Sequence, residues 1–171
     1  AGAAPERFDA AVVATHSDQA LALLADPSDA ERNILGAIRY QENHTVLHTD
    51  TSILPARKAA WASWNYHISR QELGRVAVTY DMNILQSIRA PAEFCVSLNL
   101  EARLDPSKII RRMVYHHPVY CPESLAARRR WKEINGVNRT YFAGAYWGYG
   151  FHEDGVNSAL EVCRHFGKGL P

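Results

Sequence analysis

The spacing of apolar residues changes twice along this chain, and this change limits the folds it can adopt. Before about residue 40 the apolar side chains recur at helical intervals, as in Ile34, Leu35 and Ile38. A middle stretch then alternates in short runs of β-favouring residues separated by Pro, Gly, Asn and Asp. From Pro122 onward helical spacing returns. The pattern predicts an α+β fold with flanking helices around a central sheet.

The middle stretch predicts about five strands, mostly antiparallel or mixed, because several connections are short. The predicted strands lie at 40–50, 61–68, 75–81, 94–100 and 109–115. Each end of the chain carries another apolar strand, at 8–15 and 139–143. Helices are expected after a cap at Ser17 or Asp18, after the capping segment Pro27-Ser28-Asp29, over 122–134 and over 155–166. We expect the two end strands to belong to a different layer from the middle sheet.

Composition excludes several classes of protein. The net charge is +1, which provides no global field for nucleic acid or an anionic membrane. No apolar run approaches the roughly 20 residues that a membrane-spanning helix needs. The three cysteines are odd in number and widely spaced, which favours a reducing, cytoplasmic setting over a disulfide framework. The chain opens without Met just before an apolar strand, and we interpret it as a piece of a longer protein.

The most informative segment is the strand–loop–helix near the C-terminus. A short apolar strand ends at Gly144, a loop of glycines and aromatic residues follows, and an amphipathic helix begins near Glu153 and Asp154. This order of elements brings backbone N–H groups close to a cofactor. Two carboxylates at a helix start would repel phosphate, so a neutral acceptor such as a ring carbonyl is the better guest. A capped helix after an ordinary loop is the alternative.

Several motifs resemble the FAD-dependent amine oxidase superfamily. The resemblance lies in Tyr141-Phe142-Ala143-Gly144 and, after an aromatic loop, Glu153-Asp154-Gly155-Val156. More narrowly, the segments 43–50, 60–66 and 150–155 are similar to a bacterial subgroup of predicted NAD/FAD-binding amine-oxidase-like proteins. The resemblance covers about residues 8 to 167. It implies a C-terminal fragment of a flavoenzyme that oxidises an amine or an apolar substrate.

The resemblance also implies a division of the chain and a set of site residues. Residues 1–30 would be the return strand and helix of the FAD-binding domain, 31–136 the β-rich substrate-binding domain, and 137–171 the C-terminal FAD-contacting segment. His152 would face the flavin as the catalytic residue. The residues expected to bind the cofactor are Ala14, Gly144, Ala145, Glu153, Asp154, Gly155 and Val156. Those expected to line the substrate cavity are His44, His48, Tyr146, Trp147 and Tyr149.

The sequence departs from the superfamily in three places. Ala145 and Tyr146 stand where relatives commonly carry an acidic residue, and only Lys58 and Lys108 are central candidates for the lysine near the flavin. The dinucleotide fingerprint G-x-G-x-x-G is absent from the sequence. We therefore expect FAD binding to require a missing N-terminal Rossmann domain as partner, and the fragment to be inactive and prone to self-association through the exposed interface.

Other readings of single clusters stay open. His44 and His48 share a strand face and, with Asp50, form either an acid–base or metal cluster or a polar face beside a cavity. The basic run of Arg128, Arg129, Arg130 and Lys132 favours a solvated helix face over a nucleic-acid patch. Two functional alternatives are a stand-alone β-rich module for an apolar ligand, and a metal-dependent hydrolase using His116, His117 and Cys121.

Overall fold

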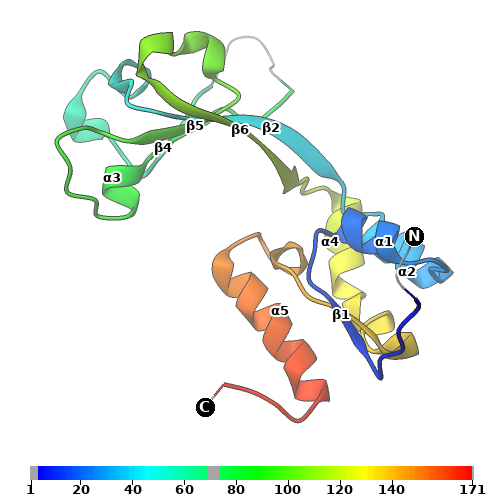
Figure 1. The fold of residues 1–171 in the computed structure, drawn as a ribbon. Helices are drawn as coiled ribbons and strands as arrows, with labels where there is room; N and C mark the ends of the chain where they lie inside the picture. The colour runs from blue at the N-terminus through cyan, green and yellow to red at the C-terminus, as the bar shows by residue number, and fades with distance from the viewer. Residues whose placement is uncertain (1–3, 69–73, 171) are drawn as a thin grey trace. The chain divides into compact units, whose positions relative to one another are not determined.

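The computed structural model describes residues 4–68 and 74–170, and the chain forms two compact units (Figure 1). The terminal unit combines Ala1–Gln41 with Pro118–Pro171, and the β-rich unit is Glu42–His117. The outermost residues of the expected 1–30 and 137–171 segments lie outside the described residues. The β-rich unit is shorter than the expected 31–136, because the helical segments on both sides of it pack within the terminal unit.

The β-rich unit is built on a five-stranded sheet in the described part of the chain, with strand order β3-β4-β5-β2-β6. The strands are β2 (Tyr40–His48), β3 (Trp64–Tyr66), β4 (Val78–Asp81), β5 (Cys95–Leu98) and β6 (Ile109–Pro118). The pairs β2–β5, β3–β4 and β4–β5 are all antiparallel, with Thr45 opposite Leu98 and Val78 opposite Leu98. The predicted α+β class and mainly antiparallel sheet are therefore confirmed.

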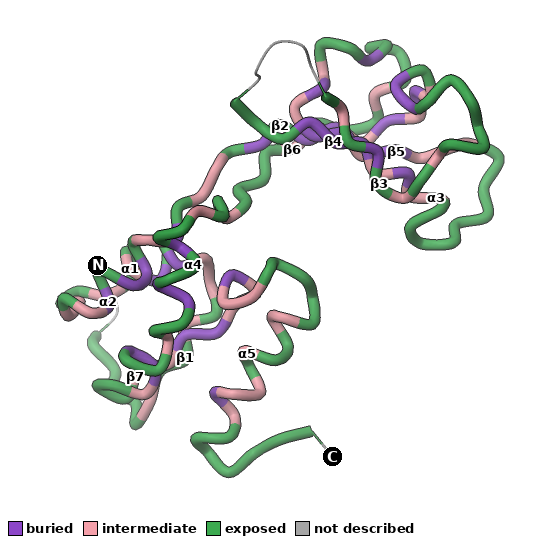
Figure 2. Tube along the Cα trace, turned by 180° about the vertical axis from the view of Figure 1, so that it is seen from behind, coloured by how far each residue is buried: buried purple, intermediate pink, exposed green. Residues whose placement is uncertain are grey.

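The core of the β-rich unit lies on one side of this sheet. Its buried residues come from strands and from the connections between them: Val46, Ile53, Leu54, Ala77, Cys95, Leu100 and Leu104. The buried parts of β2, β4 and β5 are purple in Figure 2. Helix α3 (Met82–Leu85) directly follows β4, and the Asp81 carboxylate accepts from the backbone N–H of Ile84 at its start.

The end strands lie outside the middle sheet, as expected, and they pair with each other in a separate two-stranded sheet. Strand β1 (Ala11–Val13) runs parallel to β7 (Thr140–Phe142), with Val12 opposite Tyr141. Both strands are shorter than the predicted runs of 8–15 and 139–143. Their pairing brings the first and last segments of the chain together (Figure 1).

Four helices surround this pair in the described part of the terminal unit. They are α1 (Ser17–Leu23), α2 (Asp29–Leu35), α4 (Pro122–Arg129) and α5 (His152–His165). Ser28 caps α2 through a reciprocal pair with Glu31, and Pro122 opens α4. The core joins α1, α2 and α4 to β7: Ala20, Ile34, Leu35, Ala127, Ile134 and Phe142.

Two helix boundaries differ from the sequence-based expectation. Helix α5 begins at His152 rather than at 155, so the acidic pair and Gly155 lie within its first turns. The α-helical part of α4 ends at Arg129, and a short 3-10 turn at Trp131–Glu133 continues the segment predicted as helix up to 134. Within residues 4–68 and 74–170, no helix combines the length and apolar character needed to cross a membrane.

Candidate functional site

The end of β7 is fixed on both sides by hydrogen bonds. The Asn135 side chain accepts from the Phe142 backbone N–H at 2.9 Å and donates to the Phe142 carbonyl at 3.4 Å. On the other side, the Ala143 N–H donates to the Val13 carbonyl at 3.1 Å. Ala14 follows Val13 directly, so the structure brings this predicted cofactor residue beside the strand end that leads into Gly144.

The loop after β7 is closed onto helix α5 by a serine. The Gly144 N–H donates to Ser158 Oγ at 2.9 Å, and that hydroxyl donates to the Gly155 carbonyl at 2.8 Å. A Cβ atom on Gly144 would overlap the ring of Tyr146, so this glycine allows the tyrosine to fold back over it. The predicted residues Gly144, Ala145 and Gly155 thus lie together, since the nearest neighbour of Gly155 is Ala145.

Asp154 shapes the aromatic loop instead of facing outward. Its Oδ2 atom accepts from the backbone N–H of Tyr149 at 2.9 Å and from that of Phe151 at 3.0 Å. A Cβ atom on Gly148 would overlap the same carboxylate, which explains why a glycine occupies position 148. One oxygen of the Asp154 carboxylate is therefore engaged within the loop. No side chain caps the start of α5.

The predicted aromatic residues separate into surface and interior positions. Tyr149 is 70% exposed and stacks on Tyr120 with ring centroids 6.4 Å apart, whereas Tyr146 is only 4% exposed. Burial raises the pKa of Tyr146 well above that of a free phenol. Tyr146 therefore lies in the interior and does not line the cavity as predicted. His152, Glu153 and Val156 are exposed on the first turns of α5.

A cavity of about 370 Å³ lies in the terminal unit, between the segment after α4 and helix α5. This volume falls within the range of small-molecule sites, about 300–1,000 Å³. Of the predicted residues it includes Trp147, whose Nε1 donates to the Phe142 carbonyl at 3.1 Å, and Asp154. The remaining lining residues are Trp131, Lys132, Asn135, Phe142, Gly148, Asn157, Ser158 and Glu161.

Sequence analysis missed most of this lining, although one signal was present. Asp154, Asn157, Ser158 and Glu161 follow each other at i, i+3, i+4 and i+7 on α5, which places them on one polar face of the helix. The prediction of helix α5 uses its apolar stripe alone. Such a polar stripe beside the apolar stripe of the same helix is the signal that could have indicated a lined cavity.

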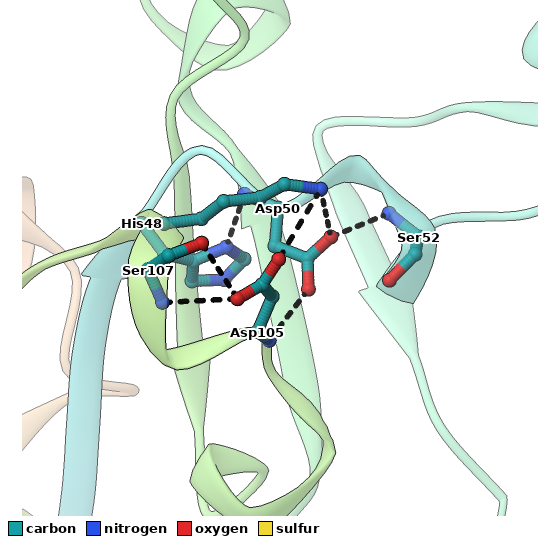
Figure 3. A network of polar contacts seen from close by, with 6 residues as sticks. His48, Asp50, Ser52, Asp105 and Ser107 are labelled. Carbon is teal, nitrogen blue, oxygen red and sulfur yellow. Dashed lines mark hydrogen bonds and ion pairs between the residues drawn. The ribbon is translucent and has the colours of Figure 1, made fainter.

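In the β-rich unit, His48 and Asp50 form a buried network (Figure 3). The Asp50 backbone N–H donates to His48 Nδ1 at 3.1 Å, so Nε2 carries the hydrogen and donates to Ser97 Oγ at 2.8 Å. Burial lowers the pKa of His48. With no exposed surface, His48 does not reach a substrate cavity as predicted.

The Asp50 carboxylate ties together the segments around it (Figure 3). It accepts from the backbone N–H groups of Ser52 at 3.1 Å and Asp105 at 2.9 Å, and from Lys108 Nζ at 3.3 Å. Burial alone would raise the pKa of Asp50, but these hydrogen bonds outweigh it and hold the pKa far below its usual range. Lys108 is thereby engaged in a structural ion pair.

His44 is not brought to the same place as His48. It is exposed, lies 3.4 Å from the Glu42 carboxylate and borders a separate hollow of about 290 Å³ with Arg75, Asn99, Glu101 and Ala102. Four of these five lining residues are polar, so the hollow lends no support to an apolar-ligand module. Across the described ranges, no three His, Cys, Asp or Glu side chains are grouped to hold a metal, and His116, His117 and Cys121 form no such group.

No protein-family model matches the chain, and a comparison with curated proteins finds no match either. What the chain does must therefore be inferred from the geometry of the terminal unit and from the motifs that lie there.

Proposed function

We propose that this chain is the substrate-binding and C-terminal flavin-contacting part of an FAD-dependent oxidoreductase resembling the amine oxidases. The flavin ring would lie against Ala14, Gly144, Ala145 and the first turns of α5 at 152–156. A separate Rossmann domain would hold the adenine and pyrophosphate half of FAD.

The proposal rests on one observation: α5 carries a glycine, Gly155, that no neighbouring side chain requires. It lies in the interior of α5, where glycine costs about 0.5–1 kcal/mol relative to alanine. Gly144 and Gly148 are each required by a neighbouring side chain, but a Cβ on Gly155 would meet only Ala145, at an ordinary 3.8 Å. Packing within the chain therefore does not require a glycine here. Close approach of a flat ring to the backbone of the helix would require one.

The sheet formed by β1 and β7 also supports a partner domain. Parallel sheets usually have both faces covered, and two strands alone are marginally stable. In the described residues this parallel pair is two strands wide, and Val12 at its centre is 52% exposed. Tyr149 and Phe151 add exposed aromatic surface beside the start of α5. These surfaces fit a protein that packs against a further α/β domain.

The residues of this chain would position the reactants. Bound flavin would supply the redox chemistry by taking a hydride from a C–H bond of the substrate. The uncapped backbone N–H groups at the start of α5 would donate to a ring carbonyl, where the helix dipole favours negative charge. Glu153 and Asp154, in the same turn, disfavour a phosphate at that position. His152 is exposed on this turn and would face the ring.

The proposal is tested by expressing the gene with the sequence that precedes this chain and recording the visible spectrum of the purified protein. We expect a yellow protein whose flavin spectrum changes in His152→Ala. The matched control is His165→Ala at the other end of α5, which should leave the flavin spectrum unchanged. A colourless protein that takes up no added FAD would refute the proposal. Equal flavin spectra for both variants would show that His152 does not contact the flavin.

A further inference from the structure

A buried arginine of the terminal unit has no partner for its charge. Arg128 lies in the last turn of α4, and only 7% of its surface is exposed. Its neighbours Arg129 and Arg130 are exposed, so the basic run does not form the single solvated face that the sequence predicts. Among residues 4–68 and 74–170, no ion pair involves Arg128.

The buried charge requires compensation. A guanidinium group remains protonated in proteins, and buried charges are almost always paired. The Nε and Nη2 atoms of Arg128 are both fully buried, and neither has a hydrogen-bond partner in the described part of the chain. Two unused donors on a buried cation indicate that an anion belongs beside them.

The two unused atoms define the shape of that anion. Nε and Nη2 form one edge of the guanidinium, which presents two parallel N–H groups. Arg130, two residues away, uses this same edge to bind Glu133, with Nε 2.9 Å from one carboxylate oxygen and Nη2 2.7 Å from the other. The free edge of Arg128 therefore matches a group with two adjacent oxygens.

Tyrosines of the same unit offer further donors. The Tyr120 ring lies 4.4 Å from Arg128 Cζ and holds the plane of the guanidinium. Tyr40 accepts from the Ser17 N–H at 3.1 Å, which leaves its own O–H free to donate. The Tyr146 hydroxyl is buried and has no partner within the described residues. Burial raises the pKa of Tyr40 and Tyr146, which keeps both hydroxyls protonated, and the charge of Arg128 opposes this effect at Tyr40.

Two carboxylates whose charge acts on these tyrosines are engaged elsewhere. The negative charge of Asp18 contributes to the raised pKa of Tyr40, and that of Asp154 to the raised pKa of Tyr120. Asp18 accepts from the backbone N–H of Gln19 at 2.8 Å, and Asp154 closes the aromatic loop. Within the described residues, neither carboxylate forms an ion pair with Arg128. The cluster therefore presents one positive charge and several donors.

We propose that Arg128, Tyr40 and Tyr146 bind the carboxylate group of a small organic ligand. One guanidinium and two neutral hydroxyls balance a single negative charge, whereas a phosphate ester carries about −1.5 to −2 at neutral pH. The stacked rings of Tyr120 and Tyr149 run from the guanidinium toward the surface and suit an aromatic or apolar ligand body. The proposal does not rest on the flavin contact, although the Tyr146 ring lies against Gly144.

The test uses sodium benzoate as the probe, with benzamide and sodium phosphate in parallel at constant ionic strength. Binding is followed by the arginine Nε–H signals in NMR spectra and by the thermal unfolding midpoint. We expect benzoate to shift one arginine Nε–H signal of the wild-type chain and to raise its thermal unfolding midpoint. The shifted signal should be absent from the spectrum of Arg128→Gln. Arg128→Gln and Tyr146→Phe should bind at least tenfold more weakly, and Arg129→Gln should bind like wild type.

Three results would overturn the proposal. Benzamide or phosphate acting as strongly as benzoate would exclude a carboxylate site, and full binding by Arg128→Gln would exclude its arginine. Absence of any benzoate effect on the wild-type signals would exclude the site itself. If Arg128→Gln does not fold, Tyr146→Phe and the wild-type Nε–H signals decide, because Tyr146→Phe removes a single hydroxyl that bonds to nothing in the described structure.

Discussion

Replacing Gly155 by alanine should have opposite effects on folding and on flavin binding. Within α5 the change removes the helix cost of glycine, about 0.5–1 kcal/mol. The new methyl group would lie 3.8 Å from Ala145, a normal contact that adds no strain. A gain of about 1 kcal/mol raises the unfolding midpoint by about 2–8 °C, depending on the size of the cooperative unit. Chemical unfolding followed by fluorescence of Trp131 and Trp147 measures this gain in the terminal unit.

The same methyl group would occupy the space in which the flavin ring is proposed to approach the helix. In the protein that includes the Rossmann domain, overpacking of about 1–3 kcal/mol corresponds to a loss of FAD affinity of roughly 5-fold to 150-fold. Gly148→Ala is the matched control, because its Cβ would overlap the Asp154 carboxylate, and it should destabilise the chain itself. The reasoning is refuted if Gly155→Ala is more stable and binds FAD as tightly as wild type.

Three further predictions concern hydrogen bonds of the structure. Ser158→Ala should lower the free energy of unfolding by about 1–3 kcal/mol in urea titrations, because the Gly144 N–H loses its acceptor; an unchanged midpoint would contradict the closure described. Asp50→Asn should cost about 3 kcal/mol, measured by hydrogen exchange in the β-rich unit, because a buried carboxylate with several donors is lost. Burial lowers the pKa of His48, so its contribution to stability is complete above the usual value of 6.5 and decreases as pH falls below it. Thermal midpoints of wild type and His48→Gln across that range should differ in slope, and parallel curves would contradict the assignment.

The layered arrangement of the chain could be predicted from sequence because it depends on local pattern. Alternating apolar residues predict the middle strands, and the two isolated apolar runs at the ends predict a separate layer, now seen as the β1–β7 pair. The unit boundaries were harder to predict. Helices α2 and α4 flank the sheet in sequence but pack on each other, and only their contacts show this.

The start of α5 illustrates a different limit. Helix starts are recognised from Ser, Thr, Asp or Asn at the cap, but Phe151 occupies this position. Asp154, inside the helix, instead accepts from the N–H of Phe151, and the N–H groups of the first turn receive no side-chain cap. Sequence therefore placed the correct residues at the helix start but moved the boundary by one turn.

Burial of single polar residues could not be read from pattern at all. Nothing in the run from Arg128 to Arg130 distinguishes the buried arginine from its exposed neighbours. The resemblance implies both Tyr146 and Trp147 as cavity walls, but consecutive residues point in different directions, and of these two Trp147 alone lines the cavity. Such assignments depend on tertiary contacts, which a single sequence does not contain.

The most direct test of the flavin contact is hydrogen–deuterium exchange on the protein that includes the preceding gene sequence, with and without FAD. FAD should slow amide exchange most strongly at 144–145 and 152–156, around Gly155, and leave the network of His48 and Asp50 in the β-rich unit unchanged. Bound FAD that protects other segments and leaves 144–156 unaffected would contradict the account.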